Sequence, residues 1–124
     1  MKEIVSFEIP GEPRTKKNHQ QIFTSGNKRW ISPSAQYKEY EEYCGWFVPS
    51  MKIDYPINLK VLYYMGTKRK VDLCNLLEAT CDILQKYGTI KDDCSDIVKG
   101  HDGSRVLYDK KKPRAEIIIE EWEE

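Results

Sequence analysis

Acidic residues gather around one helix-like segment between Lys70 and Asp96, KVDLCNLLEATCDILQKYGTIKDDCSD. Within this stretch, Asp72 precedes the helix-like residues and the pair Asp92 and Asp93 follows them. Hard cations such as Mg²⁺ take carboxylate and water oxygens as ligands. If the chain folds back across the helix, these acids predict a site for metal-assisted phosphodiester hydrolysis. The plainer alternative is a capped helix with a solvated acidic face, followed by an Asp-Asp turn.

The four cysteines make a weaker case for chemistry. Cys44, Cys74, Cys81 and Cys94 form no CxxC pair and have no histidine at zinc-finger spacing, so neither a structural zinc site nor a disulfide framework is indicated. A thiol nucleophile would also need a partner base, and no local motif supplies one. We therefore expect reduced thiols that act as small apolar side chains.

A helix over residues 73–87 must position the acidic residues. Its apolar residues recur at about 100° per residue, which is the spacing of a helix with one face in the core. Asp72 stands where an N-cap belongs, and Gly88 stands where a left-handed C-terminal residue belongs. The face expected in the core carries Leu73, Leu76, Leu77, Thr80, Ile83 and Leu84. The opposite face carries Cys74, Asn75, Glu78, Asp82 and Gln85.

Strand-like segments surround this helix. Alternating or continuous runs of β-branched and aromatic residues, bounded by Gly and Pro, predict them. The expected strands are 2–9, 57–65, 95–100 and 115–122, the last two joined by a loop. A turn at 25–27 predicts a short hairpin in a basic arm, and a second helix is expected over 34–47.

Composition indicates a single globular domain spanning residues 1–124. Hydrophobic residues make up 40% of the chain and charged residues 32%. No apolar run approaches the roughly 20 residues that span a bilayer, and no secretion signal is visible at the N-terminus. We expect a cytoplasmic protein without membrane association.

Basic residues occur in short runs although the formal net charge is zero. Neutralisation of phosphates by Lys and Arg supplies most of the affinity for nucleic acid, so the distribution of charge matters more than its sum. These runs include the candidates for phosphate contact Lys16, Lys17, Lys68, Arg69 and Lys70. The alternative is that these runs are ordinary solvated surface.

The central block resembles the RusA family of Holliday junction resolvases. The resemblance is carried by Arg69, Lys70, Asp72, Asn75, Leu76, Asp82, Leu84, Gly88, Asp92 and Asp93. It extends more weakly to FEIPGEPRTKKNH and PRAEIIIE near the two ends. It implies an α+β fold with a small mixed sheet and two main helices. It also implies a homodimer of phage or prophage type that cuts four-way DNA junctions with Mg²⁺ or Mn²⁺.

The resemblance implies roles for individual residues. Asp72 and Asp93 match metal ligands of the family, Asp92 lies beside them, and Asn75 is a polar site residue that we place among the DNA contacts. Cys74 stands where the family has a metal-binding aspartate, and Glu78 stands where it has a lysine. Because Glu78 lies about one helical turn from Cys74, its carboxylate could supply the missing oxygen.

These residues predict a structure-selective endodeoxyribonuclease that resolves Holliday junctions or related branched DNA. A second possibility is a protein that binds junctions with weak catalysis or none. A third is a small regulatory protein whose acidic helix docks a basic partner.

Overall fold

The computed structural model describes residues 1–15, 20–25, 28–33 and 35–123, and for residues 20–25 and 28–33 it describes the backbone alone. Within these residues the chain forms seven strands and two helices. In order they are β1 (Glu3–Pro10), β2 (Gln20–Ser25), β3 (Lys28–Pro33), α1 (Ala35–Cys44), β4 (Ile57–Met65), α2 (Leu73–Lys86), β5 (Val98–Gly100), β6 (Arg105–Tyr108) and β7 (Arg114–Glu121).

The main sheet is mixed and has β4 near its centre. Strand order is β1-β7-β4-β5, and β6 also pairs with β4. β7 runs antiparallel to both β1 and β4, whereas β5 and β6 run parallel to β4. The strand INLKVLYYM suits this central place because every second residue from Ile57 is buried and the residues between them are buried or half-buried. The predicted α+β fold with a small mixed sheet is confirmed.

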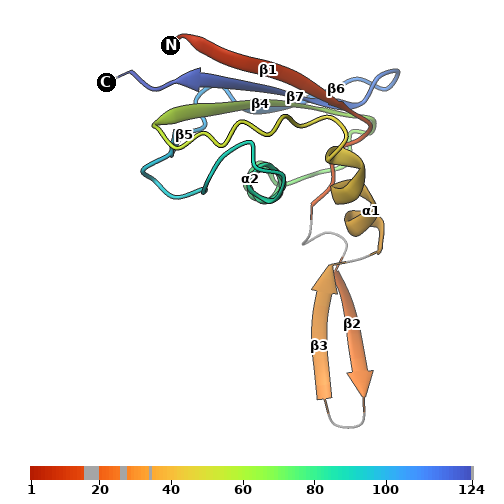
Figure 1. Cartoon of the computed structure of the whole chain (residues 1–124). Coiled ribbons are helices and arrows are strands. Elements are labelled where there is room, and N and C mark those ends of the chain that lie inside the picture. Colours follow the sequence, from red (N-terminus) through yellow and green to blue (C-terminus); the bar gives the residue numbers. More distant parts are fainter. Residues whose placement is uncertain (16–19, 26–27, 34, 124) are drawn as a thin grey trace.

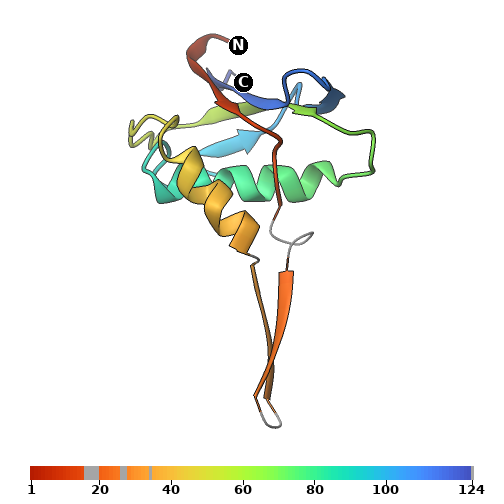
Figure 2. The same ribbon diagram turned by 90° about the vertical axis from the view of Figure 1, so that its right-hand side faces the viewer.

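Both helices lie on one face of this sheet (Figures 1 and 2). The amphipathic pattern of α2 explains its place, because the residues it buries face the sheet. These are Leu76, Ala79, Thr80, Cys81, Ile83 and Leu84. Tyr63 of β4 donates or accepts a hydrogen bond with Thr80, at 2.6 Å between the hydroxyl oxygens, and so ties helix to sheet inside the core.

The β2–β3 hairpin extends away from the sheet and helices (Figure 1). Its antiparallel register pairs Ile22 with Ile31 and Phe23 with Trp30, as the turn at 25–27 predicted. Lys16 and Lys17, the expected phosphate contacts of this arm, lie outside the described residues.

Three sequence-based expectations are wrong in detail. The strand expected over 95–100 covers only Val98–Gly100, because residues 95–97 form a turn. The loop expected between the last two strands contains β6, because residues 105–108 pair in parallel with Leu62–Met65. Helix α1 ends at Cys44 and does not continue to residue 47, since Gly45 starts a tighter turn in which its N–H donates to the Glu42 carbonyl. Neither described helix is long and apolar enough to cross a membrane.

Candidate active site

Asp72 begins α2 and is held by the helix itself. Its backbone is extended, with φ −90° and ψ 116°, and its carboxylate Oδ1 accepts a hydrogen bond from the Cys74 N–H at 2.8 Å. Its carbonyl accepts from the Leu76 N–H at 3.1 Å. Asp72 is therefore the predicted N-cap, exposed to solvent and fixed at one end of the candidate site.

The chain leaves α2 through a sharp turn that returns it to the body of the protein. Gly88 adopts a left-handed φ of 78°, which glycine tolerates without strain. The next residues form a parallel bridge between Ile90 and Ile53, and Lys91 N–H donates to the Ile53 carbonyl at 2.9 Å. This bridge places the acidic loop 91–96 beside the helix.

Three carboxylates contribute to the raised pKa of the buried Cys81 thiol. Burial is the largest cause that raises the pKa of Cys81 to about 12, and the negative charges of Asp93, Asp82 and Glu78 act in the same direction. Asp93 comes from the loop, whereas Asp82 and Glu78 are one turn apart on α2. The acidic loop and the helix therefore share one electrostatic environment.

Asp92 and Asp93 are oriented differently although they are neighbours. Asp92 lines a shallow hollow of about 360 Å³ together with Asp54 and Asp96, and its Oδ1 accepts from the Asp93 N–H at 2.8 Å. The charge of Asp93 instead contributes to the raised pKa of Cys81. Of the pair, Asp93 is the better placed to act with residues of α2.

The predicted metal ligands are not assembled into one cluster. Among the residues that the structure describes, no three His, Cys, Asp or Glu side chains are grouped closely enough to hold a metal ion. Asp72 begins the helix nine residues before Cys81, which is about 13 Å along the axis. The donor chemistry nevertheless suits Mg²⁺ or Mn²⁺, because Asp72, Asp92 and Asp93 are exposed carboxylates.

The two positions that depart from the family motif lie on the surface of α2. Cys74 and Glu78 are both exposed and are four residues apart, so they share one helical face. Asp82 continues this face and is half-buried. The sequence-based site omitted Asp82, although its spacing of four residues from Glu78 and its place in the motif could have identified it.

A cationic loop leads into Asp72. Lys68, Arg69 and Lys70 are exposed between β4 and α2, and the Lys68 ammonium lies 5.2 Å from the ring centre of Tyr108. Asn75, in the first turn of the helix, is half-buried. Positive charge therefore lies at the start of α2, and negative charge lies along its exposed face and the loop that follows.

Comparison with known families supports the resemblance seen in the sequence. Residues 10–120 match the family described as Endodeoxyribonuclease RusA. A search of curated proteins gives no significant match. The matched range leaves out β1 except Pro10 and the last residue of β7, and it covers the other strands, both helices and every predicted site residue. The chain therefore belongs to the RusA family of endodeoxyribonucleases, a family that acts on Holliday junctions.

Proposed function

We propose that the protein is a homodimeric nuclease that cuts four-way or related branched DNA by divalent-metal-dependent hydrolysis. The observation that carries this proposal is the arrangement around α2 in a chain of the RusA family. Exposed carboxylates stand at the start of the helix and in the loop that returns beside it, and a cationic loop adjoins them.

Asp72 and Asp93 are the metal ligands in this proposal, with Asp92 beside them. A bound Mg²⁺ or Mn²⁺ would stabilise charge on the phosphate and lower the pKa of a bound water. Asp72 keeps one carboxylate oxygen in the helix cap and has the other available. Loop 91–96 is exposed along its whole length, and the proposal requires this loop to move when metal and DNA bind, so that Asp93 approaches Asp72.

Glu78 compensates for Cys74 in this proposal. A thiol is a poor ligand for a hard cation, so the site needs another oxygen donor. Glu78 lies one turn along the same exposed face and already shares the environment of Asp93 and Asp82. Its longer side chain can reach toward the helix N-terminus, since side chains of a helix lean in that direction.

The cationic residues hold the DNA backbone in this proposal. Lys68, Arg69 and Lys70 contact phosphates and Asn75 hydrogen-bonds the same strand, together with Lys16 and Lys17 of the arm. Contacts of this kind fix the position of the DNA without reading its sequence, which suits an enzyme that recognises branched structure.

A second candidate function is junction binding with little or no cleavage. The exposed Cys74 at a position where the family has a carboxylate favours it, because loss of one oxygen donor weakens a magnesium site. The same cationic surface would then bind DNA that the protein does not cut.

A cleavage assay on a synthetic four-way junction separates the two functions. We expect wild-type protein to nick the junction with Mg²⁺ or Mn²⁺ and not with a chelator, and Asp93→Asn to lose this activity. Asp102→Asn, an exposed aspartate on a different loop, is the matched control. Junction binding without nicking in either metal would select the second function, and cleavage that survives Glu78→Ala would rule out compensation by Glu78.

A further inference from the structure

A small cavity lies where the segment after β1 meets the segment before α2. The sheet register explains the meeting, because Pro10 of β1 and Tyr64 of β4 both pair with Arg114 of β7. The two strands therefore finish at the same end of the sheet, and the segments that follow them lie together. Arg14, Thr15, Thr67, Arg69 and Lys70 are among the residues that line the cavity.

The lining of this cavity carries excess positive charge. Arg14, Arg69 and Lys70 contribute three cations against the one carboxylate of Glu12. That carboxylate packs against the backbone of Gly66, where an added Cβ would lie 2.8 Å from Glu12 Oε2. Ion pairs among the described residues involve Lys86, Lys112 and Arg114, and none involves the three cavity cations.

The chain holds Arg14 in place from both sides. Pro13 before it is buried, and Thr15 after it is only 1% exposed, while Arg14 itself is half-buried. A guanidinium presents a rigid fork of donors that suits a phosphate group. Side-chain freedom is already reduced before any ligand binds, which lowers the entropic cost of binding.

We propose that this cavity binds a DNA backbone phosphate beside the one that is cut, with Arg14 as the third cation next to Arg69 and Lys70. The volume is about 30 Å³, which has room for a water molecule or one phosphoryl oxygen. The phosphate therefore lies at the mouth and directs one oxygen inward. Lys70 is two residues before Asp72, at most about 7 Å along the backbone, which places the cavity next to the proposed cleavage site.

This inference rests on the proposed function, because the ligand is the same branched DNA. It adds Arg14, which the sequence motif does not single out, and it assigns one shared phosphate to Arg14, Arg69 and Lys70. It also predicts a signature that a purely structural role for Arg14 lacks. Losing one phosphate contact lowers the dependence of binding on salt, whereas local loosening of the fold does not.

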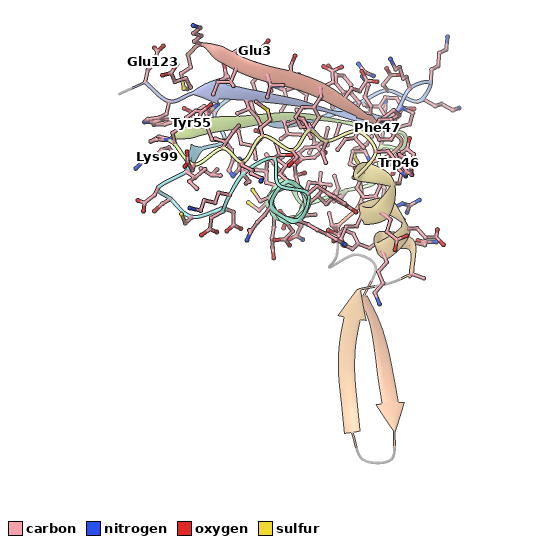
Figure 3. All side chains as sticks on the ribbon, in the orientation of Figure 1. Glu3, Trp46, Phe47, Tyr55, Lys99 and Glu123 are labelled. Atoms are coloured by element: carbon pink, nitrogen blue, oxygen red, sulfur yellow. The ribbon has the colours of Figure 1, made fainter. Side chains whose placement is uncertain are left out.

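The test is binding of a fluorescent four-way junction at several salt concentrations, without divalent metal. We expect Arg14→Ala to weaken binding roughly tenfold, as loss of a charged hydrogen bond does, and to reduce the slope of log K against log salt by about 1. Arg14→Lys should restore the slope. Lys99→Ala is the charge-matched control, because Lys99 of β5 lies beside the start of β4, whereas the cavity lies beside Met65 at the end of β4. Figure 3 shows Lys99 at the end of the sheet away from Phe47.

Equal slopes for wild type, Arg14→Ala and Lys99→Ala would overturn the inference. Arg14→Gln repeats the test with a side chain closer in shape, and thermal unfolding shows whether each variant is folded. If wild-type protein cuts junctions and Arg14→Ala binds them like wild type, the phosphate site in the cavity is rejected and the proposed function stands. If wild-type protein binds junctions without cutting them, the proposed hydrolysis is rejected, and the salt slopes still test the phosphate site. Failure of wild type to bind junctions would overturn both.

Discussion

The two segments that flank α2 differ in charge and in anchoring. Segment 66–71 is cationic and leads into Asp72, whose carboxylate and carbonyl both accept hydrogen bonds from the first turn of the helix. Segment 91–96 is acidic and exposed throughout, and backbone hydrogen bonds from Lys91 to Ile53 and from Ile97 and Val98 to Cys94 hold its two ends. One proposed ligand is therefore fixed by a helix, and the other belongs to a loop that can adjust to a metal or to DNA.

The largest effect should come from removing either proposed ligand. Asp72→Asn and Asp93→Asn should each lower the rate of junction cleavage at least about a hundredfold, the scale for a group that stabilises the reacting phosphate directly. Asn keeps the helix cap, so Asp72→Asn should remain folded. Single-turnover rates and circular dichroism check both points. A large loss in one variant alone would confine the metal to one of the two segments.

A smaller effect should come from restoring the family carboxylate. Cys74→Asp adds an oxygen donor on the exposed face of α2, between the fixed and the adjustable ligand, and should raise the cleavage rate roughly tenfold, as a modest gain in metal affinity would. Cys94→Asp, an equally exposed cysteine of the acidic loop, is the control. Rates for Cys74→Asp at or below wild type would show that Glu78 already completes the site.

Alkaline pH should weaken the core between the helices and the sheet. Burial is the largest cause that raises the pKa of Cys44 and of Cys81 from 9.0 to about 12, and burial also raises the pKa of Tyr63. Above pH 9 the unfolded chain releases these protons while the native state keeps them, so stability falls as pH rises from 9 toward 12. The loss is about 1.4 kcal/mol per pH unit for each thiol.

Urea unfolding between pH 7 and 11 measures this loss. Cys81→Ala should show a shallower decline above pH 9, because one of the thiols that must stay protonated is gone. A decline identical to wild type would mean that Cys81 ionises as freely in the native state as in the unfolded chain.

The smallest expected effect is a difference in unfolding free energy between variants of the two segments. Asp72→Ala removes a helix cap and should cost about 1 kcal/mol of unfolding free energy. Asp92→Ala removes only a hydrogen bond between neighbours in an exposed loop, so its cost should stay within about 0.5 kcal/mol. Chemical denaturation of both variants provides the comparison, and equal costs would contradict the difference in anchoring.

Local sequence signals were enough to predict the elements that carry the site. The run 57–65 and the capped helix after Asp72 were correctly predicted because hydrophobic period, cap and glycine all agree there. Strand β6 was missed because residues 105–108 are too few to show a hydrophobic period, and pairing with β4 decides their conformation.

Relations between distant segments could not be predicted in this way. The effect of Asp93 on the pKa of Cys81 depends on a loop position set by the Ile53–Ile90 bridge, which joins two short segments without a strand signal. The cavity at Arg14 depends on a register that aligns Pro10 and Tyr64 with the same residue of β7. The motif indicates which residues are chemically suitable, and tertiary pairing decides which of them meet.

The pairing of β1 with β7 also affects when the protein becomes functional. Residues 3–10 pair with residues 114–121, so β1 has no partner strand until β7 has been synthesised. Loop closure over nearly the whole chain makes such folding slow and concerted. The sheet behind α2 is therefore completed late during synthesis.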